Sequence, residues 1–383
     1  MTPAARIAAA IGILDQILDG KPAEAALIGW SRSSRFAGSK DRAAVRDHVF
    51  DALRCRRSFS ALGGAETCRG LMIGALRAQG SDPDGIFTGE GHAPSTLTEE
   101  ERGYTAPELS DAERLDWPDW LWPIVQTDLG QEAEAALAAM QQRGPVFLRV
   151  NRRRGDVSKA IALLSEDGVG AVPHASVAGC LIVTENPRRV QASAAMTNGL
   201  IELQDASSQR AMLALPQATK VLDYCAGGGG KSLALADRGC QVFAHDIQPD
   251  RMSDIPVRAK RAGFNINVTT KPNRSGPYDL VLCDAPCTGS GTWRRTPDAK
   301  WRLTQDRLSE LTQIQASILS DVHTMVAEGG TLAYATCSIL TQENRQVVDR
   351  FIAAHSEWDM VDELRLLPSD QWDGFYLAQL KRR

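Results

Sequence analysis

The sequence lacks the features by which membrane and secreted proteins are recognised. None of its apolar runs reaches the roughly 18 residues that a membrane-spanning helix needs. The first 20 residues do not form a signal peptide, because Asp15 and Asp19 interrupt their apolar face. We therefore expect a cytoplasmic protein with no membrane partner. Its 383 residues, 43% hydrophobic and 23% charged, are typical of a globular chain with two or three domains.

The cysteine pattern is that of neither a disulfide framework nor a zinc site. The eight cysteines are scattered along a long chain, which favours free thiols. The closest pair, Cys283 and Cys287, has no second pair and no His-x-His partner to complete four zinc ligands. We therefore expect no metal.

Neither common nucleotide-binding motif is complete. In YCAGGGGKS, residues 224–232, a P-loop would need glycine where Cys225 stands, and a dinucleotide motif would need glycine where Ser232 stands. The flanking stretches TKVLDYC and KSLALADRG predict a buried strand and a helix. A strand, a glycine turn and a helix together form a general cofactor site. An NTPase is disfavoured, because the P-loop spacing is not met.

The net charge of −4 hides three basic clusters. The most common role of any one cluster is a solvated surface, but three together favour a polyanionic substrate. The clusters comprise Arg32, Arg35, Lys40, Arg42, Arg46, Arg54, Arg56 and Arg57; Arg149, Arg152, Arg153, Arg154 and Lys159; and Arg294, Arg295, Lys300 and Arg302.

The hydrophobic pattern divides the chain into three parts. Residues 1–140 contain amphipathic helices, such as RIAAAIGILDQIL and RAAVRDHVFDALR, followed by a connector rich in Gly, Pro and Trp. Residues 141–216 predict a small α/β, RRM-like subdomain with strands PVFLRVN and CLIVTE. In residues 217–383 strands and helices alternate, which predicts an α/β fold with a doubly wound, Rossmann-like parallel sheet.

The informative side chains follow the strands of this last part, where such sheets bind ligands. Asp246 ends the strand after the glycine turn, a place where carboxylates receive ribose hydroxyls. Two later loops, 284–301 and 334–344, each contain a cysteine in a polar setting. Most cysteines are buried structural residues, but a thiolate placed there can attack a substrate. Pyrimidine methylation at carbon 5 needs such an attack, because a thiolate on carbon 6 makes carbon 5 nucleophilic.

Four sequence strings resemble the motifs of RNA 5-methylcytosine methyltransferases, the family of bacterial rRNA small-subunit methyltransferase B. They are DYCAGGGGKS, DAPCTGSGTWRRTPDAKW, YATCSI followed by EN, and DGFYLAQL, and the match covers about residues 200–383. The stretch SKDRAAVRDHVFDALRCRR is similar to the all-helical, NusB-like RNA-binding domain of the same enzymes.

This resemblance implies a role for each matching residue. Cys337 would be the nucleophile, Cys287 would assist product release, and Asp284 would contact the cytosine and the methyl donor. Lys231 and Lys300 would help electrostatically, and Pro286 would shape the Cys287 loop. The cofactor S-adenosyl-L-methionine would be bound by Cys225, Ala226, Gly227, Gly228, Gly229, Gly230, Lys231, Asp246, Asn273 and Asp284.

Two positions depart from the family pattern. Gly228 stands where the family usually has proline, which gives a more flexible turn. The stretch INVTTKPNRSGPYD has no carboxylate before Asp279 to approach the adenine, and Asn273 is the nearest polar candidate.

The function expected from the resemblance is methylation of cytosine carbon 5 in RNA, foremost small-subunit ribosomal RNA, by a monomeric enzyme. A transfer RNA substrate and a non-catalytic RNA-binding factor are the alternatives. A DNA-type enzyme would use Cys287 as its nucleophile and would not need Cys337.

Overall fold

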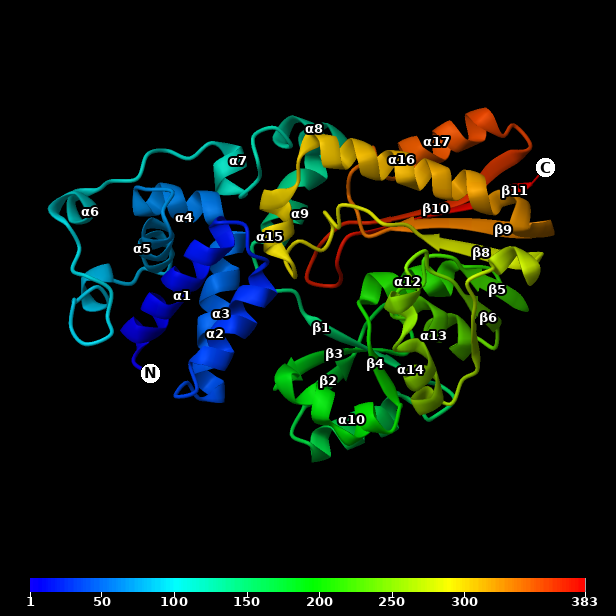
Figure 1. Cartoon of the computed structure of the whole chain (residues 1–383), viewed down its shortest axis with the longest axis horizontal. Coiled ribbons are helices and arrows are strands. Elements are labelled where there is room, and N and C mark those ends of the chain that lie inside the picture. Colours follow the sequence, from blue (N-terminus) through cyan, green and yellow to red (C-terminus); the bar gives the residue numbers. More distant parts are fainter. Residues whose placement is uncertain (383) are drawn as a thin grey trace. The chain divides into compact units, whose positions relative to one another are not determined.

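The computed structural model describes residues 1–382, which form two compact units (Figure 1). One unit contains residues 1–143 together with 293–302, and the other contains 144–292 and the chain from 303 onward. Among the described residues, no helix is long and apolar enough to cross a membrane.

The first unit is entirely helical. Its main helices are α1 (Pro3–Leu18), α2 (Ala23–Ser33), α3 (Ser39–Arg54), α4 (Arg56–Gly63), α5 (Cys68–Ala78), α6 (Glu99–Gly103), α7 (Asp111–Arg114), α8 (Trp122–Leu129), α9 (Ala133–Met140) and α15 (Pro297–Arg302).

The amphipathic helices predicted in this unit are confirmed. Helix α1 begins at Pro3, where Thr2 accepts a hydrogen bond from Ala5 N, and its buried stripe includes Ile7 and Leu14. Helix α3 buries Val45, Val49 and Leu53 at helical spacing. The likeness of this unit to NusB stays a prediction.

The segment 293–302 packs into the helical unit, which the sequence did not predict. The rings of Trp293 and Trp117 lie 5.1 Å apart, and both are at most 1% exposed. The N- and C-terminal parts of the segment both bind the end of α3: Arg54 Nε donates to Arg294 O at 2.7 Å, and Lys300 Nζ donates to Arg54 O at 3.2 Å. Burial lowers the pKa of Lys300 to about 8.

Asp116 joins the Trp-rich connector to the start of α4. Its carboxylate, fully buried, accepts hydrogen bonds from Arg57 N at 2.8 Å and Ser58 N at 2.9 Å, which are orphan donors of the first helical turn. Ser58 Oγ and Gln141 Nε2 donate to the same side chain at 2.9 Å and 2.6 Å. The connector is therefore fixed by one buried acid.

Replacement of Asp116 by alanine should destabilise the protein by about 3 kcal/mol, because it leaves several buried donors without an acceptor. Denaturant unfolding of the full chain measures this loss. Asp119→Ala is the control, because the Asp119 side chain is 81% exposed and its ion pair with Arg57 should contribute less than about 1 kcal/mol. An equal loss in both variants would contradict the role of Asp116.

The second unit begins with a four-stranded antiparallel sheet of order β2-β3-β1-β4. Its elements follow one another as β-α-β-β-α-β, a ferredoxin-like arrangement that RRM domains share. They are β1 (Val146–Val150), α10 (Val157–Glu166), β2 (Gly170–Pro173), β3 (Cys180–Glu185), α11 (Ala194–Thr197) and β4 (Ile201–Leu203). The strands predicted at 145–151 and 180–185 are confirmed, while the short β2 and β4 were not predicted.

The rest of the second unit is a seven-stranded sheet of order β10-β11-β9-β8-β5-β6-β7, covered by helices on both faces. The elements are α12 (Ala206–Ala214), β5 (Lys220–Asp223), α13 (Gly230–Asp237), β6 (Gln241–Ala244), α14 (Ile255–Ala262), β7 (Ile266–Val268), β8 (Tyr278–Asp284), α16 (Gln305–Val322), β9 (Val326–Thr336), α17 (Arg345–Ala354), β10 (Trp358–Leu366) and β11 (Phe375–Arg382).

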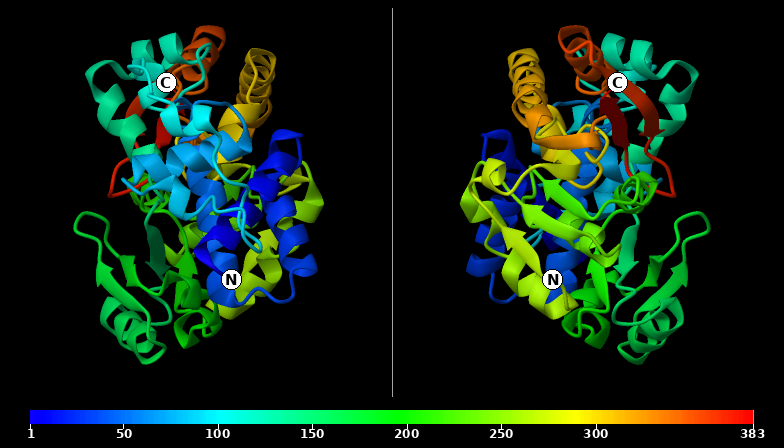
Figure 2. Two further views of the ribbon diagram at one scale, coloured as in Figure 1. Left: turned by 90° about the vertical axis from the view of Figure 1, so that its left-hand side faces the viewer. Right: turned by 90° about the vertical axis from the view of Figure 1, so that its right-hand side faces the viewer.

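Successive residues of the central strands face opposite sides of this sheet. Val221 packs with α12, α13 and α14, while its neighbour Leu222 packs with α16 and α17, the gold and orange helices of Figure 2. The five strands from β7 to β9 are parallel, which confirms the predicted doubly wound fold. The antiparallel hairpin of β10 and β11 was not predicted.

Candidate active site

A pocket of about 540 Å³ lies beyond the carboxyl ends of the central strands. The strand order reverses there, because the chain runs from β5 outward to β7 and then returns to β8 on the other side of β5. Its walls are the loops after β5, β6, β8 and β9 together with one side of α16. The lining residues are Tyr224, Cys225, Ala226, Gly227, Gly228, Asp246, Ile247, Arg251, Asp284, Ala285, Pro286, Cys287, Ile314, Ser317, Ile318, Asp321 and Cys337.

The glycine turn forms one wall of this pocket. Gly227 and Gly229 have φ angles of +50° and +81°, a region that side-chain-bearing residues rarely adopt. A Cβ on Gly229 would also lie 2.7 Å from Ile255 Cγ1. The turn is tied to the end of β6, because Gly227 N donates to Asp246 Oδ2 at 3.0 Å.

The pocket fits an adenosine group. The nearly buried carboxylate of Asp246 offers acceptors for ribose hydroxyls, and Arg251 Nη1 lies 3.2 Å from it. The next residue, Ile247, is 85% exposed, and Ile314 on α16 is 41% exposed. Two exposed isoleucines on a pocket wall provide apolar surface for a purine ring.

Two side chains of the first turn of α13, Lys231 and Ser232, bind acids at the ends of β8 and β5. Lys231 Nζ donates to Asp284 Oδ2 at 2.6 Å and lies 5.2 Å from the centre of the Phe375 ring. Burial by itself lowers the pKa of Lys231, but the attraction of Asp284 outweighs it and raises the pKa. The buried Asp223 accepts from Ser232 Oγ at 2.6 Å, and burial raises its pKa to about 6.

The two candidate cysteines meet on the pocket wall, with Cys287 Sγ and Cys337 Sγ 3.5 Å apart. Their environments differ. The hydrogen bond with Cys287 lowers the pKa of Cys337, burial and the charge of Asp284 oppose this shift, and the Lys231 cation adds to it. The same hydrogen bond raises the pKa of Cys287, followed by burial and the nearby charge of Glu343. The pKa of Cys337 is therefore the lower of the two.

The carboxylate of Glu343 holds the two cysteine loops together, and its role was not predicted from the sequence. Glu343 is fully buried and accepts from Thr288 N at 2.8 Å and from Gln315 Nε2 at 3.1 Å. The hydroxyls of Thr288 and Ser338 also donate to it. Thr288 directly follows Cys287, and Ser338 directly follows Cys337. One buried acid thus fixes the residues next to both thiols.

Several predicted residues lie outside the pocket lining. Gly229, Gly230 and Lys231 belong to the turn and the start of α13 behind it. Asn273 is exposed in a short 3-10 turn and does not line the pocket. Lys300 belongs to the helical unit and also does not line it.

The order of the two thiol pKa values can be measured by alkylation. In the isolated protein, iodoacetamide should modify Cys337 at lower pH than Cys287, because only the thiolate reacts. Cys287→Ala removes the S–H donor, so the midpoint pH for Cys337 alkylation should rise. Peptide mass spectrometry across a pH series reads both sites, with Cys55 as an internal control, since burial raises its pKa to about 12. Faster modification of Cys287, or an unmoved Cys337 midpoint, would contradict the assignment.

The parallel sheet with a glycine turn and a strand-end acid defines the class as Rossmann-like, S-adenosylmethionine-dependent methyltransferases. A family model described as 16S rRNA methyltransferase RsmB/F matches residues 210–381, and one described as the ferredoxin-like domain of RsmF/B-like methyltransferases matches 117–191. The chain is 34% identical over 293 residues to Ribosomal RNA small subunit methyltransferase B of Escherichia coli, covering 72% of this chain and 68% of that one. The chain belongs to the RsmB/F family of RNA methyltransferases.

Solved structures share the fold. The crystal structure of PH0851 aligns with a TM-score of 0.77 and 24% identity, covering 100% of this chain and 99% of that chain. NSun6 from Pyrococcus horikoshii aligns with a TM-score of 0.60 and 15% identity, covering 70% of this chain and 98% of that chain. At these identities the likeness concerns the fold alone.

Proposed function

We propose that the protein methylates carbon 5 of a cytosine in small-subunit ribosomal RNA, with Cys337 as the covalent nucleophile. The observation that carries the proposal is the 3.5 Å contact between two thiols on the wall of the cofactor pocket. An RNA substrate of this kind would place the enzyme in the cytoplasm. Cys225, Ala226, Gly227, Gly228 and Asp246 would hold S-adenosylmethionine, which supplies an electrophilic methyl group.

Cys337 begins the reaction as a thiolate that adds to carbon 6 of the base and makes carbon 5 nucleophilic. After methylation, a base takes the proton from carbon 5, the double bond between carbons 5 and 6 forms again, and the bond between carbon 6 and Cys337 Sγ breaks so that Cys337 leaves as a thiolate. The S–H group of Cys287 then stabilises the departing thiolate by the same hydrogen bond that lowers its pKa before attack. Cys287 therefore acts in release.

Asp284 supports cytosine as the target base. Its carboxylate, paired with the Lys231 ammonium, is an acceptor that matches the amino group on carbon 4 of cytosine. Uracil presents a carbonyl oxygen at that position, so two acceptors would face each other without a proton between them. Discrimination of this kind is strong, because it leaves buried polar groups unpaired.

The alternatives predict different behaviour. A DNA-type enzyme attacks with Cys287, yet the hydrogen bond between the two thiols lowers the pKa of Cys337 and raises that of Cys287. A non-catalytic factor would not need a polarised thiol pair. Transfer RNA remains the alternative substrate.

The two cysteine variants should fail differently when incubated with substrate RNA and S-adenosylmethionine. Cys337→Ala should lose methyl transfer and form no covalent RNA complex, because carbon 5 is never activated. Cys287→Ala should attack and methylate but stall before release, so a denaturant-resistant protein–RNA adduct should accumulate. Denaturing gels detect the adduct. An adduct in Cys337→Ala alone would reverse the assignment.

The target RNA is identified by bisulfite sequencing of ribosomal and transfer RNA after reaction with the wild-type enzyme. One protected cytosine in small-subunit ribosomal RNA is the expected result. Protection only in transfer RNA would favour the alternative substrate.

The helical unit contributes the proposed RNA contacts, but only part of the basic segment 32–57 is free to make them. Arg46 pairs with Glu24, and Arg54 and Arg57 bind groups within the unit. The α2–α3 junction differs, because Arg32 near the end of α2, Arg35 in the loop and Lys40 at the start of α3 are exposed and have no partner among the described residues. Between them Phe36 is 76% exposed. Cations around an exposed aromatic ring form a surface for single-stranded RNA.

Simultaneous replacement of Arg32, Arg35 and Lys40 by glutamine should weaken the salt dependence of RNA binding. The slope of the logarithm of the binding constant against the logarithm of the salt concentration should fall by about 2 in magnitude, since each lost phosphate contact removes roughly 0.7. Phe36→Ala should weaken binding by about 1–3 kcal/mol with the slope unchanged, because stacking releases no counterions. Filter binding at several salt concentrations measures both. Arg46→Gln is the matched control and should leave the slope as it is, since Glu24 already neutralises Arg46. A slope that falls only in Arg46→Gln would contradict this surface.

A further inference from the structure

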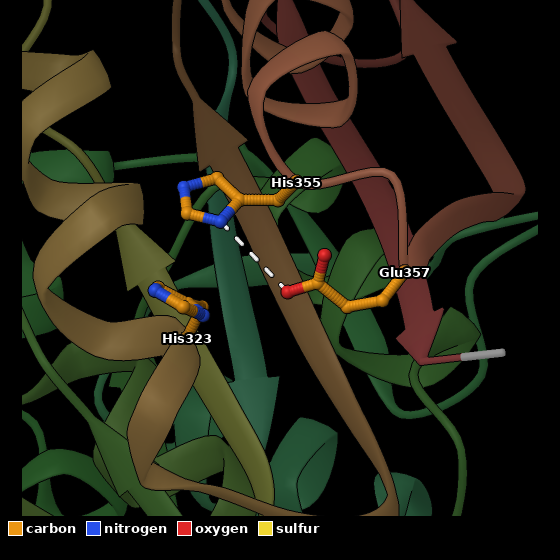
Figure 3. Close-up of side chains that lie close together, drawn as sticks. All are labelled: His323, His355 and Glu357. Carbon is orange, nitrogen blue, oxygen red and sulfur yellow. Dashed lines mark ion pairs between the residues drawn. The ribbon is translucent and has the colours of Figure 1, made fainter.

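Two of the six histidines of the chain meet a glutamate at the ends of α16 and α17 (Figure 3). His323 follows α16, His355 follows α17, and Glu357 lies two residues further on. Their ligand atoms lie within 4.8 Å of one another, and all three side chains are half-buried. The two imidazole centres are 4.3 Å apart, and His355 Nδ1 lies 3.8 Å from Glu357 Oε1.

The surroundings of this cluster favour a cation. Both histidines are the C-terminal caps of their helices, where unpaired carbonyl groups and the helix dipole concentrate negative potential. Glu357 adds a negative charge near His323, and Arg382 adds a positive charge that acts in the opposite direction. Burial, and then the neighbouring His355, lower the pKa of His323.

We propose that His323, His355 and Glu357 form a binding site for a divalent transition-metal ion, with Zn²⁺ the best match. Two imidazoles and one carboxylate are a common zinc ligand set, which a water molecule completes. Zinc-to-ligand bonds of about 2.0–2.2 Å place ligands roughly 3–3.5 Å apart, so ligand atoms up to 4.8 Å apart must close by about 1.5 Å. The three half-buried side chains lie just after the ends of two helices and can do so by rotation.

The bound ion would tie the end of α16 to the end of α17. Helix α16 contributes Ile314, Ser317, Ile318 and Asp321 to the wall of the cofactor pocket, and Gln315 to the Glu343 carboxylate. A metal at its C-terminal end would therefore stabilise the helix that flanks the methylation site. The site goes beyond the proposed methylation and does not depend on it.

Calorimetric titration of ZnCl₂ into the full chain tests the site. The titration uses a Cys287→Ser, Cys337→Ser background, because the adjacent thiols are themselves zinc ligands. One Zn²⁺ per chain should bind, and His323→Ala and Glu357→Gln should each weaken binding at least tenfold. His92→Ala, a change at an exposed histidine in the helical unit, is the matched control and should leave binding unchanged.

Thermal unfolding gives a second readout. ZnCl₂ should raise the melting temperature of the background protein and of His92→Ala, but not that of His323→Ala, because only binding to the folded state stabilises it. Glu357→Gln keeps the side-chain volume, so it tests the site even if His323→Ala fails to fold. No binding, or binding that survives both substitutions, would overturn the proposal.

Discussion

The buried carboxylate of Glu343 is the interaction on which the geometry of the thiol pair depends. A charge removed from water costs several kcal/mol unless hydrogen bonds replace its hydration, and Glu343 receives them from the residues beside both cysteines and from α16. The loops after β8 and β9 are therefore fixed to each other as well as to their strands. Asn344 adds to this, since its side chain accepts from Thr336 and donates to Ser338 O at 2.9 Å.

The environments of the two thiols in the pocket differ, and their pKa values differ as a result. The hydrogen bond between the thiols shifts their pKa values in opposite directions, and the Lys231 ammonium, paired with Asp284, lowers the pKa of Cys337 further. Two identical side chains at 3.5 Å thus have pKa values shifted in opposite directions. A mechanism with one attacking and one releasing thiol requires such a difference before any substrate binds.

The sequence predicted the parts of the site that lie at strand ends and could not predict those fixed by tertiary contacts. Asp246, Asp284 and Cys337 were found because parallel strands place their carboxyl ends at one edge, and the structure brings them to one pocket. Glu343 gave no signal beyond its place in a matching motif, since an acid in a loop is usually exposed. The histidine cluster was missed because its members are far apart in the chain.

The same limit applies to the fold. Helices α1 and α3 and the parallel strands were predicted from local periodicity. The hairpin of β10 and β11 was missed because β10 alternates weakly, with only Trp358 and Leu366 buried along it. The docking of 293–302 among the helices was missed because it depends on long-range partners such as Trp117.

The return of residues 293–302 to the helical unit also has a consequence for biosynthesis. The helical unit, although most of it is made before the second unit, lacks part of its core until synthesis has passed residue 302, because Trp293 and Lys300 supply buried side chains to it. Its final folding must therefore wait for more than half of the catalytic unit to be made, a sequence separation that slows folding and exposes apolar surface meanwhile. An N-terminal fragment that ends at residue 143 would leave Trp117 without its partner ring. The helical unit therefore needs the later segment 293–302 to complete its core, although each unit has a core of its own.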